Sequence, residues 1–218
     1  MVDQALTDKM LSVDQPMSEN PTRFSTISLL LKGARSLSGR NLQTGVYELR
    51  EFNETNFING TYHSFQFTGL IDYLILLEQV GSIFKPINKS TIDKNPIPRA
   101  LGYFTLLESK KIESVVGLRN SIAHKFGLAT ESSPRNGSRK FALSNNRNVA
   151  VIDLPQTPWN GDFSDKSDAT TTIVYLHDLI DLIESVYQSI ISENKCGNIE
   201  MTLEGGIAEL YARYTMIY

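Results

Sequence analysis

The segment Leu118-Arg119-Asn120-Ser121-Ile122-Ala123-His124 combines side chains suited to acid–base chemistry on an anion. The unperturbed pKa of histidine is about 6.5, so His124 can accept or release a proton near neutral pH. Arg119 carries a permanent charge on a planar group that fits the oxygens of a phosphate. These are the residue types with which a protein handles a proton and a phosphate together.

The spacing of the surrounding residues predicts that this segment is helical. One stripe of the helix would hold Arg119 together with the apolar residues Ile112, Val115, Ile122 and Phe126. An unpaired guanidinium would be costly there, so Arg119 must meet a carboxylate, lie at a subunit interface or bind an anionic ligand. Asn120 and His124 share a neighbouring polar face. From physical arguments alone, an interior salt bridge with a surface or capping histidine explains the segment slightly better than a ligand site does.

The residues Arg119-Asn120 and Ala123-His124 resemble the signature of the HEPN superfamily (higher eukaryotes and prokaryotes nucleotide-binding). Ribonuclease members of that superfamily carry an arginine, often followed by a polar residue, about four to six residues ahead of a histidine. The resemblance extends over about residues 62–195 but is specific at only about six positions. Many toxin members have a tyrosine two residues after the histidine, which a partner nucleotidyltransferase modifies. Phe126 stands there, so this mode of regulation is not implied.

The resemblance implies metal-independent RNA cleavage of the toxin or defence type, in which the RNA 2′-OH attacks the adjacent phosphate. His124 would be the acid or base, Arg119 would stabilise the phosphorane, and Asn120 would orient His124 or bind the phosphate. Arg119 and His124 are five residues apart, which is about 140° around a helix. They converge poorly on one phosphate unless the helix begins or bends there, or unless two copies form a homodimer with a shared cleft.

Two other functions remain open. The chain could be a non-catalytic HEPN dimerisation or nucleotide-binding subunit that acts with a partner enzyme. It could also be an unrelated helical domain in which Arg119 is structural. For the ribonuclease we expect RNA, a second copy of the chain and an antitoxin or other regulatory protein as partners.

The charge distribution favours a nucleic-acid partner more than the net charge of −3 does. Residues 110–147 contain eight basic and two acidic residues, whereas the other 180 residues contain 13 basic and 22 acidic ones. On charge alone a basic segment of this kind is more often a solvated surface, although it can also bind phosphates. The predicted RNA-binding residues are Lys110, Lys111, Lys125, Arg135, Arg139, Lys140 and Arg147.

Several other chemistries are excluded or disfavoured. The chain has no P-loop and no Gly-x-Gly-x-x-Gly motif, and one cysteine, Cys196, provides neither a disulfide framework nor a cysteine-based zinc site. Three scattered histidines make a histidine-rich metal site unfavourable. His177 and Asp181 are four residues apart, a possible pair of metal ligands that is more often a hydrogen bond. We therefore expect neither a metal nor a cofactor.

The hydrophobic pattern predicts a mainly all-α, HEPN-like helical bundle with one small β-hairpin. A loose tail over 1–23 precedes a single domain over 24–218, whose core covers about 62–195. Helices are predicted from Tyr62 to Phe84, from Arg99 to about Phe126 with a bend near Gly117, from Ala169 to Asn194, and from Ile207 to Arg213. The hairpin, over about 140–154, pairs 140–144 with 149–154.

The helix from Tyr62 to Phe84 is apolar nearly all round, which is typical of the middle of a core or of a subunit interface. No apolar run is long enough to span a bilayer, and residues 1–21 lack the apolar run of a secretory signal. We therefore expect a soluble, cytoplasmic protein with no membrane partner.

Overall fold

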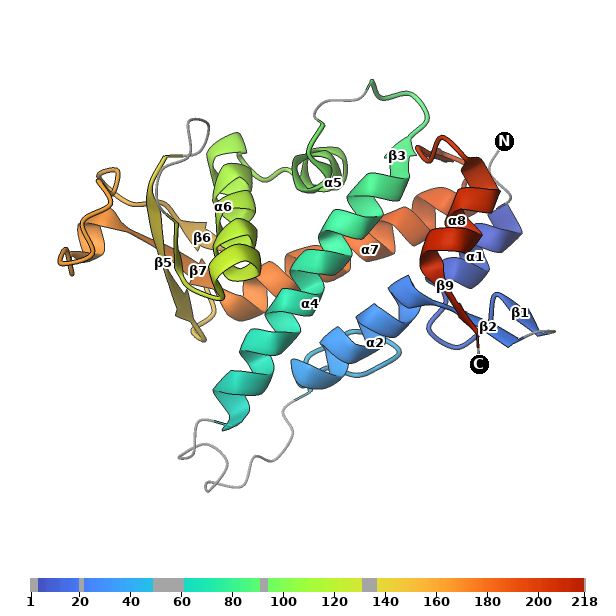
Figure 1. The fold of residues 1–218 in the computed structure, drawn as a ribbon, viewed down its shortest axis with the longest axis horizontal. Helices are drawn as coiled ribbons and strands as arrows, with labels where there is room; N and C mark the ends of the chain where they lie inside the picture. The colour runs from blue at the N-terminus through green and yellow to red at the C-terminus, as the bar shows by residue number, and fades with distance from the viewer. Residues whose placement is uncertain (1–3, 20–21, 49–60, 91–93, 131–136, 218) are drawn as a thin grey trace.

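A central helix organises the computed structural model, which describes residues 4–19, 22–48, 61–90, 94–130 and 137–217. This helix, α4 (Thr61–Ile83), runs diagonally across Figure 1 and crosses α7 (Leu176–Lys195). The other helices surround this pair: α1 (Gln4–Leu11), α2 (Thr26–Leu37), α5 (Pro96–Phe104), α6 (Ser109–Lys125) and α8 (Gly206–Tyr214). The predicted helices over 62–84 and 207–213 are confirmed within one residue at each end.

The expectation of a mainly all-α bundle with one hairpin is wrong, because the described residues also form three β-sheets. One sheet joins β1 (Ser18–Glu19), β2 (Thr22–Ser25) and β9 (Thr215–Ile217), and a second joins β3 (Phe84–Pro86) and β8 (Ile199–Met201). The third has the order β4 (Ala129–Thr130), β5 (Arg139–Ser144), β7 (Thr171–Tyr175) and β6 (Ile152–Asp153). The fold is therefore mixed α/β.

The predicted hairpin over 140–154 is also wrong in its pairing. Strands β5 and β6 belong to one sheet, but β7 lies between them, parallel to β5 and antiparallel to β6. Strand β7 lies in the segment that the sequence predicts as the start of a helix beginning at Ala169. A short 3₁₀ turn, Asp168–Thr170, precedes β7, and α7 begins only at Leu176. Alternating apolar residues showed that strands exist here but not which strands are neighbours.

The helix expected over 99–126 is two helices, α5 and α6, and the break does not lie at Gly117. It lies at 105–108, where the Thr105 hydroxyl donates to the Leu101 carbonyl oxygen and accepts from the Leu107 N–H. Gly117 has a packing role within α6. A Cβ there would lie 3.1 Å from Cδ of Arg139 and 3.2 Å from the Phe141 ring, so glycine lets β5 approach the helix closely.

The expected loose tail over 1–23 is ordered in its described part. Met10, Leu11 and Met17 are at most 3% exposed, and the Asn194 amide donates to the Asp8 carboxylate at 2.8 Å. Because the segment is mostly polar, its composition did not indicate that these three apolar side chains pack into the core. The hydrophobic core consequently extends beyond 62–195, from α1 to α8.

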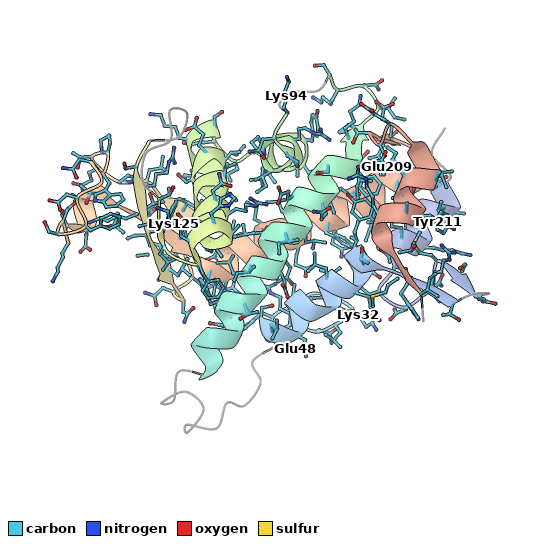
Figure 2. All side chains as sticks on the ribbon, viewed as in Figure 1. Lys32, Glu48, Lys94, Lys125, Glu209 and Tyr211 are labelled. Atoms are coloured by element: carbon cyan, nitrogen blue, oxygen red, sulfur yellow. The ribbon has the colours of Figure 1, made fainter. Side chains whose placement is uncertain are left out.

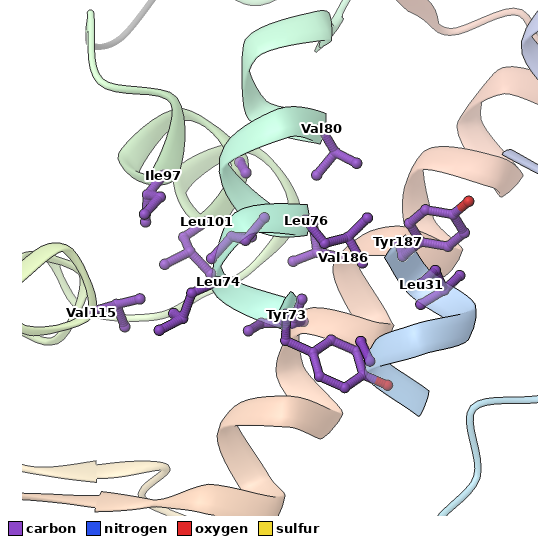
Figure 3. Close-up of a cluster of buried hydrophobic side chains, with 14 of the residues drawn as sticks. Leu31, Tyr73, Leu74, Leu76, Val80, Ile97, Leu101, Val115, Val186 and Tyr187 are labelled. Atoms are coloured by element: carbon purple, nitrogen blue, oxygen red, sulfur yellow. The ribbon is translucent and has the colours of Figure 1, made fainter. Parts of the chain in front are cut away.

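Most of the described part of helix α4 is covered by other helices of the same chain, although Thr68 and Ile75 are exposed. Figure 3 shows Leu74 facing Leu101 of α5 and Val115 of α6, whereas Tyr73 and Leu76 face α2 and α7. These side chains are at most 1% exposed. The apolar character of this helix therefore does not by itself require a subunit interface.

A buried network of charges ties the loop after α2 to α7. The Arg35 guanidinium donates to both carboxylate oxygens of Glu184 at 2.8 Å, and the Tyr73 hydroxyl donates to Glu184 Oε1 at 2.5 Å. Burial of the phenol and the neighbouring carboxylate raise the pKa of Tyr73. Arg40, 1% exposed, donates to the Gly45 carbonyl oxygen and pairs with Asp181 at 2.6 Å. Every charge in this network has an opposite charge beside it.

Candidate functional site on helix α6

Helix α6 carries the Arg119–His124 segment and is continuous through it. The helix ends at Lys125, and Phe126 follows in a left-handed conformation (φ 49°) with its N–H donating to the Ile122 carbonyl oxygen at 2.9 Å. Val115 and Ile122 of this helix are buried against the core. Phe126, in contrast, is 72% exposed, because the helical stripe stops one residue before it.

Arg119 meets a carboxylate from the central helix. Its Nε and Nη2 both donate to Oε2 of Glu78, at 3.0 and 2.5 Å, and both side chains are 25% exposed. Its Nη1 donates to the side-chain oxygen of Asn120 at 3.3 Å. These three hydrogen bonds use three of the five N–H donors of a guanidinium. The site residue that sequence reasoning missed is thus Glu78.

His124 is exposed near the end of the same helix. Because α6 neither begins nor bends between Arg119 and His124, these side chains remain about 140° apart around the helix. Asn120 lies between them in azimuth and contacts Arg119. The structure brings Arg119, Asn120 and Glu78 together within one chain, and it places His124 on the exposed side of the helix.

An apolar cavity of about 320 Å³ adjoins Arg119 between α4 and α6. The exposed Phe126 forms one edge and packs against Phe67 with ring centroids 5.5 Å apart. The remaining walls are Ile71, Leu74, Ile75, Ile122 and Ala123. The Arg119 guanidinium therefore lies between the Glu78 carboxylate and the apolar cavity.

Three of the predicted RNA-binding cations form pairs within the chain. Arg139 donates to the Ser114 hydroxyl at 2.8 Å and to the Glu113 carboxylate at 3.1 Å. Lys140 donates to the Asp165 carbonyl oxygen at 2.7 Å and lies 3.3 Å from its carboxylate. Arg147 bridges Asp178 and Asp181 on α7. These contacts reduce the charge that the three residues present to an external phosphate.

The other predicted cations are spread over different surfaces. Lys111 donates to the Ala150 carbonyl oxygen at 3.1 Å, and Lys110 is exposed beside a second cavity. Lys125 is exposed at the end of α6, near the four-stranded sheet (Figure 2). Arg135 lies outside the described residues. The basic segment is therefore not one continuous stripe in its described part.

His177 and Asp181 do not form a metal site with each other. His177 is buried against the ring of Tyr47, and its Nε2 lies 3.4 Å from the Gln66 amide nitrogen. Asp181 instead pairs with Arg40 and Arg147. Within the described part of the chain, no group of three or more His, Cys, Asp and Glu side chains could hold a metal ion. Cys196 is exposed at the end of α7.

Comparison with protein-family models, with curated proteins and with solved structures gives no match to the chain. Among the described helices, none is both long enough and apolar enough to cross a membrane.

Proposed function

We propose that the protein is a metal-independent RNA endonuclease of the toxin or defence type, acting in the cytoplasm as a homodimer. The observation that carries the proposal is the geometry of α6, a continuous helix with Arg119, Asn120 and His124 in its last two turns. The resemblance of these residues to the HEPN signature supplies the reaction.

His124 would exchange protons with the RNA, since an exposed imidazole can act as a base or an acid. In the reaction the 2′-oxygen forms a bond to phosphorus while the bond from phosphorus to the 5′-oxygen breaks. The products are a 2′,3′-cyclic phosphate and a free 5′-hydroxyl. One proton leaves the 2′-oxygen and one arrives at the 5′-oxygen, so two proton transfers are needed.

Arg119 would stabilise the extra negative charge of the phosphorane. Glu78 and Asn120 occupy three of its N–H donors and fix the plane of the guanidinium, which leaves two donors for phosphate oxygens. Glu78 is thus a positioning residue, and its negative charge lowers the affinity of Arg119 for the phosphate in the ground state.

A second copy of the chain would complete the site. The unbent helix separates Arg119 from His124 by about 140°, so the two side chains of one chain do not reach one phosphate together. Packing two α6 ends around a two-fold axis would place Arg119 of one copy beside His124 of the other. The exposed Phe126 and the apolar cavity beside Arg119 would be covered in such a contact.

A non-catalytic dimerisation or nucleotide-binding subunit is the second candidate. The ion pairs of Arg139, Lys140 and Arg147 favour it, because they engage cations that an RNA-cleaving protein would offer to flanking phosphates. A dimer that binds RNA or nucleotides without cleaving RNA would support this second function.

Mixing of two inactive variants tests the shared site. Arg119→Ala and His124→Ala should each lose most cleavage as homodimers, while Arg213→Ala, which removes an ion-paired arginine on α8, should not. A mixed dimer of the first two variants retains one complete pair and should recover part of the activity. Full activity of either single variant would contradict the proposed roles, and a monomer in light scattering at micromolar concentration would contradict the dimer.

A further inference from the structure

A second cavity lies on the opposite side of α6 from the Arg119–Glu78 pair. It has a volume of about 360 Å³ and lies between the N-terminal half of α6, strands β5 and β7, and the loop over 154–170. That volume falls in the range of small-molecule sites. Lys110 and Glu113 of α6 face this cavity, whereas Arg119 faces α4.

One wall of the cavity is apolar and firmly held. It contains the only tryptophan of the chain, Trp159, together with Leu154, Pro155 and Pro158. Trp159 is 5% exposed, and its indole N–H donates to the Asp162 carbonyl oxygen at 3.0 Å. The Asp162 carboxylate in turn accepts from the N–H and hydroxyl of Ser164, which lowers the pKa of Asp162. The Trp159 ring also packs edge-to-face against Phe163, with ring centroids 5.3 Å apart. The loop therefore presents a fixed apolar wall to the cavity, to which Trp159 contributes only its small exposed edge.

The opposite side of the cavity is cationic. Arg139 extends from β5, and the Ser114 hydroxyl holds its Nη1 at 2.8 Å. Its Nη2 binds the carboxylate of Glu113, whose side chain is 63% exposed. The exposed Lys110 lies one turn before Glu113 on α6. An ion pair this exposed contributes at most about 1 kcal/mol, so a ligand carboxylate can replace that of Glu113 at small cost.

We propose that this cavity binds a small aromatic carboxylate, with its ring against the apolar wall that contains Trp159 and its carboxylate on Arg139 and Lys110. A purely apolar ligand would gain no attraction from Arg139 and Lys110, and a bare inorganic anion would leave the apolar wall exposed to water. The group that Arg139 already holds at the cavity is a carboxylate, which favours this anion over a phosphate. The proposal does not depend on RNA cleavage.

The single tryptophan makes the test direct, because its indole N–H gives one resolved signal in a ¹H–¹⁵N spectrum of the full-length protein. The probes are 1-naphthoate and its neutral amide, 1-naphthamide. Naphthoate should shift the indole signal in a saturable manner with a Kd below ~1 mM. The amide should bind at least about tenfold more weakly, which corresponds to ~1.4 kcal/mol.

Variants assign the two cations. Arg139→Gln should weaken naphthoate binding by about tenfold or more, and Lys110→Ala by about threefold or more, which are losses of ~1.4 and ~0.7 kcal/mol. Lys195→Ala, which changes an exposed lysine at the end of α7, should leave binding unchanged. Because Arg139 also contacts Ser114, dispersion of the remaining signals checks its folding, and the surface variant at Lys110 serves if Arg139→Gln does not fold.

Three results would overturn the proposal. They are an indole signal that stays in place up to ~1 mM naphthoate, equal affinities for naphthoate and naphthamide, and tighter binding of adenosine monophosphate than of naphthoate. Arg119→Ala should bind naphthoate normally, so loss of RNA cleavage and loss of this site can be told apart.

Discussion

The ion pair between Arg119 and Glu78 should contribute about 1–2 kcal/mol of coupling to the free energy of unfolding. At an effective dielectric constant near 20, two charges about 4 Å apart attract by about 4 kcal/mol, and desolvation and side-chain ordering offset much of this. Exposed pairs yield about 0.2–1 kcal/mol, and breaking a buried pair costs about 3–5 kcal/mol. A pair that is 25% exposed on each side lies between these limits.

A double-mutant cycle measures this coupling. The variants are Glu78→Gln, Arg119→Met and the two combined, each unfolded in urea at low salt with circular dichroism as the signal. The control cycle uses the pair of Arg213 and Glu209 on α8, which is one turn apart along the helix and 64% exposed at the arginine. That pair should give no more than about 0.5 kcal/mol. A coupling for Arg119 and Glu78 at or below the control value would refute the argument that Glu78 holds the guanidinium.

Three further predictions concern the buried network and its loop. Gly45→Ala should lower the free energy of unfolding by about 2–4 kcal/mol, because a Cβ at this residue (φ +71°) would lie 2.5 Å from the Glu184 carboxyl group. The control Gly197→Ala has a similar φ of +69° but nothing within 4 Å, so it should lose only about 1 kcal/mol. Equal losses of the two variants in urea unfolding would contradict the contact. Tyr73→Phe should lose about 1.5–3 kcal/mol in the same assay, since the hydroxyl donates to a buried carboxylate, and a neutral effect would contradict that role. Burial, and then two nearby arginines, lower the pKa of His177, so below about pH 6.5 the unfolded chain binds a proton that the folded chain does not bind. The free energy of unfolding should therefore fall from pH 7 toward pH 5 by at most about 1.4 kcal/mol per pH unit. If His177→Gln shows the same dependence on pH, His177 is not its origin.

The elements with strong local signals could be predicted from the sequence. Helix α4 is a long, mostly apolar stretch without proline, and α8 begins at the Gly205–Gly206 pair, so their positions needed no tertiary information. Strand β7 could not be recognised in the same way. Its apolar Ile173 falls in helical spacing with Leu176 at the start of α7, and its strand partner β5 is distant in the sequence. Tertiary pairing therefore overrode the helical pattern.

For the candidate site, sequence reasoning established that Arg119 needs a partner but not which partner. The chain has 24 acidic residues, and only the packing of α6 on α4 selects Glu78. For the predicted basic surface, the sequence likewise did not show which acidic residues pair with the cations. Glu113 is near in sequence to the Lys110–Lys111 pair, yet its partner is Arg139 on a strand, which sequence spacing does not reveal. Charge counts along the chain cannot show which charges meet after folding.

Analysis of the RNA ends produced in EDTA tests the central claim most directly. The purified homodimer should cleave single-stranded RNA without metal ions and leave 2′,3′-cyclic phosphate and 5′-hydroxyl ends, identified by mass spectrometry. His124→Ala, with an unchanged melting temperature, should leave the RNA intact. Equal cleavage by wild type and His124→Ala, or a folded dimer that leaves RNA uncut, would contradict the account.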